Sequence, residues 1–231
     1  MRITKSVFMK QALNMFKNPT VLVMFVIFPA VALIMTQLIA KPDDAIPYNM
    51  FVTMMSAIFA GMGLITASAD VIAEDIERRS LRFLILAGVK PHQYLIGTGG
   101  FFLAAGAVTS VLFALIGDFT GVETAKFLAI MVSGTAASII LGAAIGMFST
   151  NRQAATSLGM PAAMLIGFVP MIAAFNETVE KFSGFLYTQQ INVIVNDFSA
   201  GLAKPLLVVA SNIAVFAALF ALAYKKKGLK G

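Results

Sequence analysis

Residues 70–90 combine charged and apolar side chains at a spacing that could bind another protein. The segment holds eight charged residues, out of 17 basic and 11 acidic ones in the chain, and lies between two long apolar stretches. In a helix, Glu74 would pair with Arg78 and Asp75 with Arg79, each four residues apart with the acid first, which is the favourable order. A short charged helix between two membrane spans is a structure to which a soluble partner can bind.

The same segment carries apolar side chains that a solvated loop would not need: Ile76, Leu81, Phe83, Leu84, Ile85 and Leu86. The sequence predicts one helix over residues 74–87. Gly88 should end it, and Pro91 should prevent its continuation. The alternative is a loop that is simply solvated. Because such loops favour polar residues, we expect the helix to dock against a surface.

The elements that position this segment are apolar stretches long enough to cross a membrane. The chain is 59% hydrophobic and 12% charged, with a mean hydropathy of +0.88, whereas soluble domains are about 25% charged. A span needs about 20 apolar residues. Six stretches qualify, and none contains Asp, Glu, Lys or Arg: 21–40, 50–69, 94–116, 127–148, 154–175 and 205–224. The sequence therefore predicts an all-α integral membrane protein that forms one domain over residues 1–231.

The distribution of basic residues predicts the orientation of these spans, because cytoplasmic loops are enriched in Lys and Arg. Thirteen of the 17 basic residues fall in the two terminal segments and in the loops after the second and fourth spans. The other four are Lys41, Lys126, Lys181 and Lys204. We therefore expect both termini in the cytoplasm of a multi-pass protein of the cell membrane. The net charge of +6 follows from this topology, so a nucleic-acid partner is not expected.

The N-terminal segment, residues 1–18, has the pattern of a helix lying on the membrane surface. Its basic and polar face carries Lys10, Asn14 and Lys17, and its apolar face carries Phe8, Ala12, Met15 and Phe16. Separation of basic and apolar residues at helical spacing suits the cytoplasmic interface of a membrane. The alternative is a plain extension of the first span.

The long loop before the last span, residues 176–204, is unusually apolar. Its apolar residues recur at helical spacing: Ile191, Ile194, Val195, Phe198 and Leu202. We expect an external helical segment that folds back on the bilayer surface or dips into it.

Two further sets of residues stand out within the predicted spans. The fourth span has a small residue at every fourth position: Gly134, Ser138, Gly142 and Gly146. Such a stripe lets another helix approach closely, either within the chain or in a second subunit. The strongly polar points are candidates for a substrate pathway, although interhelical hydrogen bonds would equally explain them: Thr36, Gln37, Ser211 and Asn212.

The chemistry of an enzyme is missing from the sequence. There is one histidine, His92, and no cysteine, so the usual nitrogen and sulfur ligands cannot form a metal site. No phosphate-binding Gly-x-x-x-x-Gly-Lys-Ser/Thr loop is present. Ion-coupled carriers usually bury an acid or a histidine in a span, and these spans contain none. We therefore expect neither catalysis nor a cofactor in this chain, and any energy for transport must come from another chain.

The charged segment resembles the cytoplasmic loop of type 2 ATP-binding-cassette (ABC) transporter permeases. Those proteins have an acid-Arg-x-x-Gly-Thr-Leu-Glu-x-Leu-like stretch, a small-Pro-Val-like turn and a Gly-Lys-like pair that opens the next span. The corresponding residues here are Glu77-Arg78-Arg79-Ser80-Leu81-Arg82-Phe83-Leu84, Ala87-Gly88-Val89 and Tyr94-Leu95-Ile96-Gly97. Arg79-Ser80 replaces Gly-Thr, Arg82 replaces an acid, and Thr98 replaces Lys. The resemblance extends over the whole chain, from the N-terminal helix to the apolar segment before the last span.

The resemblance implies a permease that works with a second permease copy, identical or not, and with two cytoplasmic ABC ATPase subunits that bind ATP and Mg²⁺. The predicted helix would be the coupling helix that the ATPases push, and the family is mostly export-directed. The residues expected to contact the ATPase are Glu74, Asp75, Glu77, Arg78, Arg79, Leu81, Phe83 and Leu84. Because polar lining is scarce, we expect an amphipathic or hydrophobic substrate such as a peptide, a drug or a lipid-like molecule. An ion-coupled carrier and a non-transporting membrane scaffold are the alternatives.

Overall fold

The computed structural model describes residues 2–17, 19–39 and 48–229, in which every regular element is a helix. Lys41 and Lys230, which entered the charge count above, lie outside these ranges. In chain order the elements are α1 (Arg2–Lys17), α2 (Pro19–Leu38), α3 (Met50–Ile58), the π-helical segment η1 (Phe59–Gly63), α4 (Leu64–Glu77), α5 (Ser80–Leu86), α6 (Pro91–Ile116), α7 (Val122–Phe148), α8 (Arg152–Ala173), α9 (Glu177–Ser183), α10 (Tyr187–Asn196) and α11 (Ala203–Leu229).

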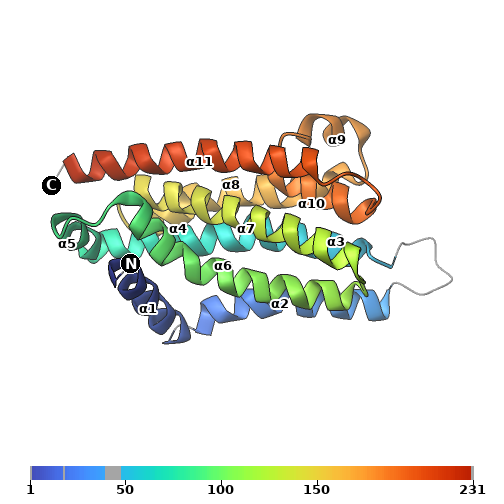
Figure 1. The fold of residues 1–231 in the computed structure, drawn as a ribbon, viewed down its shortest axis with the longest axis horizontal. Coiled ribbons are helices and arrows are strands. Elements are labelled where there is room, and N and C mark those ends of the chain that lie inside the picture. Colours follow the sequence, from blue (N-terminus) through green and yellow to red (C-terminus); the bar gives the residue numbers. More distant parts are fainter. Residues whose placement is uncertain (1, 18, 40–47, 230–231) are drawn as a thin grey trace.

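The predicted all-α class and the six predicted apolar helices are confirmed. Among the described residues, five helices are long and apolar enough to cross a membrane, and Leu22–Leu38 forms a shorter apolar helix. These helices run side by side along one axis (Figure 1). One end of the bundle carries α5, the start of α1 and the end of α11, and we call it the α5 end. The opposite end carries α9 and α10, and we call it the α9 end.

The second span is longer than its apolar stretch. Elements α3, η1 and α4 follow one another without a break over Met50–Glu77, whereas the predicted span ended at residue 69. Backbone hydrogen bonding propagates along a helix whether the side chains are apolar or charged. The helix therefore carries the acidic residues of the 70–90 segment out of the apolar region on a rigid extension.

Helix α1 is a separate element that crosses α6 at an angle (Figure 1). Its buried Val7 faces Gly97, where an added Cβ would lie 2.7 Å from the valine side chain. Phe8, from the predicted apolar face, lies over Gly100 in the same way. The glycines of α6 therefore allow α1 to pack closely, and part of its apolar face contacts the protein.

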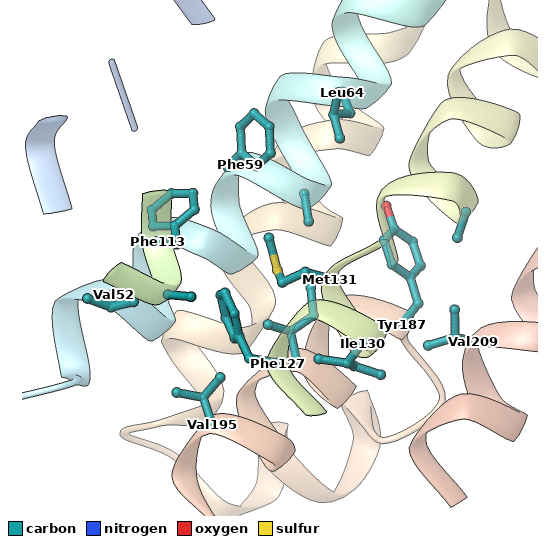
Figure 2. Packing of buried hydrophobic residues seen from close by; sticks show 14 of the residues in the cluster. Val52, Phe59, Leu64, Phe113, Phe127, Ile130, Met131, Tyr187, Val195 and Val209 are labelled. Atoms are coloured by element: carbon teal, nitrogen blue, oxygen red, sulfur yellow. The ribbon is translucent and has the colours of Figure 1, made fainter. Parts of the chain in front are cut away.

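The core is formed by aromatic and branched side chains from α3, η1, α6, α7 and α10 (Figure 2). Phe59 of η1 is fully buried, with its ring centroid 6.0 Å from that of Phe113 and 5.8 Å from that of Phe25. Phe127 of α7 and Tyr187 of α10 belong to the same cluster. Aromatic residues bury large areas and dominate the energetics of packing.

The apolar loop before the last span forms α9 and α10, and the bundle covers the apolar residues of α10 that recur at helical spacing, whereas Phe182 and Phe185 are exposed. Ile191, Ile194 and Val195 are buried among α3, α7, α8 and α11. The opposite side of α10 is also buried, and its polar side chains bond to α8. Thr188 Oγ1 donates to the carbonyl of Ile166 at 2.7 Å, and Asn192 Nδ2 donates to the carbonyl of Pro170 at 3.0 Å.

Two intrahelical prolines are accommodated by threonines of neighbouring helices. Proline has no N–H, so Pro170 leaves the carbonyl of Ile166 without its helical donor, and Thr188 supplies one. Pro29 likewise leaves the carbonyl of Phe25 free, and Thr109 Oγ1 of α6 lies 3.2 Å from it. Neighbouring helices satisfy such carbonyls in the apolar interior, where water is not available.

Candidate functional site

The predicted single helix over residues 74–87 is wrong, because the chain breaks between α4 and α5. Arg79 has a φ of 59°, in the left-handed region, and separates Glu77 from Ser80. The Ser80 hydroxyl lies 2.6 Å from Asp75 Oδ1 and 3.1 Å from the Asp75 carbonyl. Serine competes in this way for backbone and side-chain acceptors that would otherwise belong to the helix. The spacing of charged and apolar residues, from which the single helix was predicted, contains no information about this competition.

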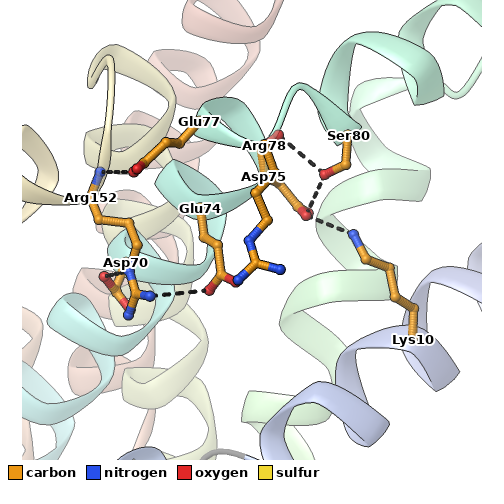
Figure 3. Close-up of polar contacts among 8 residues, drawn as sticks. All are labelled: Lys10, Asp70, Glu74, Asp75, Glu77, Arg78, Ser80 and Arg152. Atoms are coloured by element: carbon orange, nitrogen blue, oxygen red, sulfur yellow. Dashed lines mark hydrogen bonds and ion pairs between the residues drawn. The ribbon is translucent and has the colours of Figure 1, made fainter.

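Asp75 joins α4 to three other elements at the break, and Figure 3 shows its contacts with Lys10 and Ser80. Its side chain accepts from Lys10 Nζ of α1 at 2.6 Å, from Ser80 of α5, and from the Tyr94 hydroxyl of α6 at 2.9 Å. The residue is only 7% exposed. A buried carboxylate must be paired to offset its desolvation, and these donors meet that need. The predicted Asp75–Arg79 pair is replaced by these contacts.

A second cluster fastens α4 to the start of α8 (Figure 3). The Arg152 guanidinium binds Asp70 with two hydrogen bonds of 2.8 and 2.6 Å, and Glu74 lies 3.7 Å away. The backbone N–H of Arg152 donates to Glu77 at 3.0 Å. Glu74 also pairs with Arg78 at 2.9 Å, as the spacing predicts. A two-bond contact fixes the guanidinium in orientation as well as position.

Helix α5 is anchored on one side and closed by glycine. Leu81 is 3% exposed and packs with Tyr94 and Tyr224, while Leu84 is partly buried against the same cluster. Gly88, with a φ of 79°, ends the helix as predicted: its N–H donates to Ile85, and the N–H of Val89 donates to Leu84.

The connection after α5 is also held by α11. The Tyr224 hydroxyl of α11 donates to the carbonyl of Val89 at 2.8 Å. Lys227, further along α11, donates to the carbonyl of Ser149 at 2.8 Å. The α5 end is therefore tied together across α5, α7 and α11.

The outer side of α5 is exposed and combines basic with apolar residues. Phe83 is 71% and Leu86 75% exposed, and the side chains of Arg79 and Arg82 are also exposed. These four positions recur at helical spacing and define what we call the α5 face: Arg79, Arg82, Phe83 and Leu86. Large exposed apolar side chains beside charged ones are typical of protein contact sites.

The structure separates the eight residues predicted to contact a partner into two groups. Arg79 and Phe83 lie on the α5 face, and the side chains of Glu77 and Arg78 are exposed beside it. Asp75 and Leu81 are buried, and Glu74 and Leu84 are partly buried, so these four hold the site together. The prediction of this site did not include three residues that anchor it: Lys10, Tyr94 and Arg152. It also did not include two exposed residues of the α5 face, Arg82 and Leu86. Lys10 and Arg152 are 65 and 82 residues from their acidic partners, which no local spacing can reveal.

The small-residue stripe of α7 packs against α4 and α10 of the same chain. An added Cβ at Gly142 would lie 2.3 Å from the carbonyl oxygen of Ile65, and one at Gly146 would lie 2.5 Å from that of Ala69. Ser138 donates to the carbonyl of Ala60 in η1 and is hydrogen bonded to the Tyr187 hydroxyl at 2.7 Å. Gly134 faces the side chain of Ile191. The small-residue stripe is therefore buried in contacts with other helices of the same chain.

The candidate pathway residues do not converge. Thr36 is buried in α2, whereas Gln37 is exposed beside it. Asn212 of α11 donates to the carbonyl of Phe185 at 2.9 Å, and Ser211 donates within its own helix. Helices α2 and α11 lie on opposite sides of the bundle in Figure 1. Among the described residues, no group of three or more His, Cys, Asp or Glu side chains could hold a metal ion.

Comparison with protein families matches residues 3–188 to the ABC-2 type transporter family. Comparison with curated proteins gives no match. The matched region includes α1 through α9, and therefore the second span, its charged extension, the break at Arg79 and the α5 face. The chain belongs to the ABC-2 type transporter family, and so is a multi-pass membrane permease of an ABC transporter, a class that works with an ABC ATPase subunit.

Proposed function

We propose that this chain is the permease subunit of an ATP-driven exporter and that α5 is its coupling helix. The observation that carries the proposal is the α5 face, which exposes Phe83 and Leu86 together with two arginines. It lies at the end of the bundle where α11 also ends, which the distribution of basic residues predicts to be cytoplasmic. A cytoplasmic ATPase with an apolar groove and acidic rim would complement this face.

The contacts around α5 suit the transmission of force. Asp75 links α4 and α5 to α1 and α6, Arg152 links α4 to α8, and Tyr224 links the end of α5 to α11. A displacement of α5 by the ATPase would be transmitted directly to these helices through the contacts named above. Packed side chains, ion pairs and rigid helices in contact are structures that can carry such coupling.

The rest of the proposed assembly has two copies of the ATPase, which bind ATP and Mg²⁺, and a second permease copy. The small-residue stripe is already covered within this chain, so we assign the contact between permeases to another surface. The substrate is proposed to be amphipathic or hydrophobic, such as a peptide, a drug or a lipid-like molecule, and to leave the cytoplasm. Support comes from the family, from the apolar spans, and from the small number of charged residues in them.

The test is a double substitution on the α5 face, Phe83→Ser with Leu86→Ser, in the permease expressed with its ATPase. Both side chains are largely exposed, so we expect normal folding, with loss of ATPase co-purification and of substrate-stimulated ATP hydrolysis in proteoliposomes. Ser substitution of Leu115 and Val122, exposed apolar residues at the α9 end, is the matched control. Retention of the ATPase by the Phe83/Leu86 variant would refute the assignment of α5.

A further inference from the structure

The turn between α9 and α10 lies well below the ends of the neighbouring helices. The carbonyl of Phe185 accepts from Asn212 of α11, and Asn212 follows the first residue of that helix by nine residues. On α8, Thr188 bonds to Ile166, which precedes the last residue of that helix by seven residues. At 1.5 Å per residue, these partners place the turn about 10–13 Å below the ends of α8 and α11.

The length of α8 indicates where the hydrocarbon of a bilayer would end on this side. The helix has 22 residues, so it is about 33 Å long. The hydrocarbon layer is about 30 Å thick. The two ends of α8 therefore lie near the two boundaries of this layer, and the turn lies at the depth of lipid acyl chains.

The sequence around the turn contains no charged residue. The last charged residue before the turn is Lys181, and the next one is Asp197. All residues from 182 to 196 are uncharged. A charged side chain among acyl chains is costly. A segment that enters the hydrocarbon and returns would have this pattern, with charged residues at its two ends and none between them.

The backbone of the turn is hydrogen bonded in the way that a membrane interior requires. The carbonyl of Gly184 accepts from Gln190 Nε2 of α10 at 2.7 Å, and the carbonyl of Phe185 accepts from Asn212 Nδ2 of α11 at 2.9 Å. Irregular backbone at membrane depth must find its partners within the protein, because no water is available there. Amide side chains of α10 and α11 supply these partners.

The ring of Phe185 is 68% exposed at this turn. The adjoining helices also expose large apolar side chains below this end, with Leu165 on α8 and Leu207 on α11. Exposed apolar surface on membrane-spanning helices is suited to contact with lipid, so Phe185 would extend a surface of the same kind. Phe182 is exposed as well, but it follows Lys181 directly and is closer to the charged part of α9.

We propose that the turn between α9 and α10 re-enters the leaflet at the α9 end, and that the Phe185 ring contacts lipid acyl chains there. Phe182 lies nearer the boundary with water. The occupant of this exposed surface is thus lipid, and not solvent or a second subunit. The proposal requires only that the chain spans a membrane, so it is independent of the ATPase contact assigned to α5.

The absence of tryptophan from the chain allows the environment of the ring to be measured directly. Phe185→Trp introduces a single fluorophore into the full-length permease, which is then reconstituted in lipid nanodiscs. We expect phosphatidylcholine brominated along its acyl chains to quench most of the emission, and iodide in the water to quench little. Phe83→Trp, at a ring of similar exposure on the α5 face, is the matched control and should respond in the opposite way.

Each other occupant would give a different result. Strong quenching of the Phe185→Trp protein by iodide would place the ring in water. Quenching by neither agent would show that protein covers it, for example a second permease copy. Either result overturns the proposal. Phe182→Trp, nearer the boundary, should be quenched by iodide more than Phe185→Trp is.

A second pair of variants tests the same proposal without a fluorophore. Phe185→Asp would put a carboxylate among acyl chains, so it should lower the melting temperature of the permease in nanodiscs. Phe83→Asp changes a ring of similar exposure at the other end and should leave the melting temperature of the isolated permease nearly unchanged. Equal melting temperatures for these two variants would show that the turn does not lie in the hydrocarbon.

Discussion

At the scale of single residues, Asp75 shows how burial selects the partners of a side chain in the α5 region. Its neighbour Glu74 makes the local helical pair that spacing predicts, whereas Asp75 bonds to α1, α5 and α6. Local spacing predicts contacts one helical turn away but cannot choose between a partner on the same helix and one on another. In this structure Asp75 is buried and Arg79 is exposed, so Asp75 pairs with residues of other helices and not with Arg79.

Asp75→Ala should lower the melting temperature of the permease in detergent, because Tyr94 and Lys10 lose their acceptor. We expect a loss of about 1–3 kcal/mol, and a smaller loss for Asp75→Asn, which keeps an acceptor oxygen. Glu177→Ala, at an exposed acid in the first turn of α9, is the control and should cost about 0.3–1 kcal/mol. An Asp75→Ala protein that melts with the control would show that this cluster does not stabilise the fold.

At the scale of elements, hydrogen bonds between threonines and proline-freed carbonyls join neighbouring helices. Thr188 fixes α10 against α8, and Thr109 fixes α6 against α2. The prolines are visible in the sequence as interruptions of a helix. Their threonine partners are not visible, because 22 residues separate Thr188 from Ile166 and 84 separate Thr109 from Phe25.

The pairing of Thr188 with Pro170 can be tested by a double-mutant cycle. Thr188→Val should cost about 1–3 kcal/mol, because the buried carbonyl of Ile166 loses its donor. In a Pro170→Ala background the same substitution should cost much less, since the alanine restores the helical N–H. Chemical unfolding of the four proteins measures the coupling, and Thr178→Val on exposed α9 serves as the control. Equal costs of Thr188→Val in both backgrounds would disprove the pairing.

At the scale of the whole molecule, the bundle separates two surfaces with different chemistry. The α5 end has an exposed basic and apolar face over a network of ion pairs. The α9 end has a pocket with carboxylates, amides and apolar walls. In the exporter that we propose, energy input would occur at the α5 end and substrate release at the opposite end.

The orientation of the molecule can be measured with single cysteines, since the chain contains none. Ala87→Cys, at the exposed end of α5, and Phe182→Cys, on exposed α9, should label from opposite sides. In intact cells, a membrane-impermeant maleimide should modify only the cysteine at position 182, and permeabilisation should expose the one at position 87. Labelling of both sites in intact cells, or the reverse order, would refute the predicted topology.

The sequence by itself determined the membrane class, the six apolar helices, the end of α5 at Gly88 and the family resemblance. These properties depend on composition, on short-range periodicity and on the conformation that glycine permits, all of which are local. The tertiary structure decided that α4 and α5 are separate helices, that Asp75, Leu81 and Leu84 face inward, and that α10 is covered by the bundle. It also brought Asn212 of α11 to the carbonyl of Phe185. Those outcomes depend on which side chains compete for the same buried hydrogen bonds and the same space, and that competition exists only once distant segments are in contact.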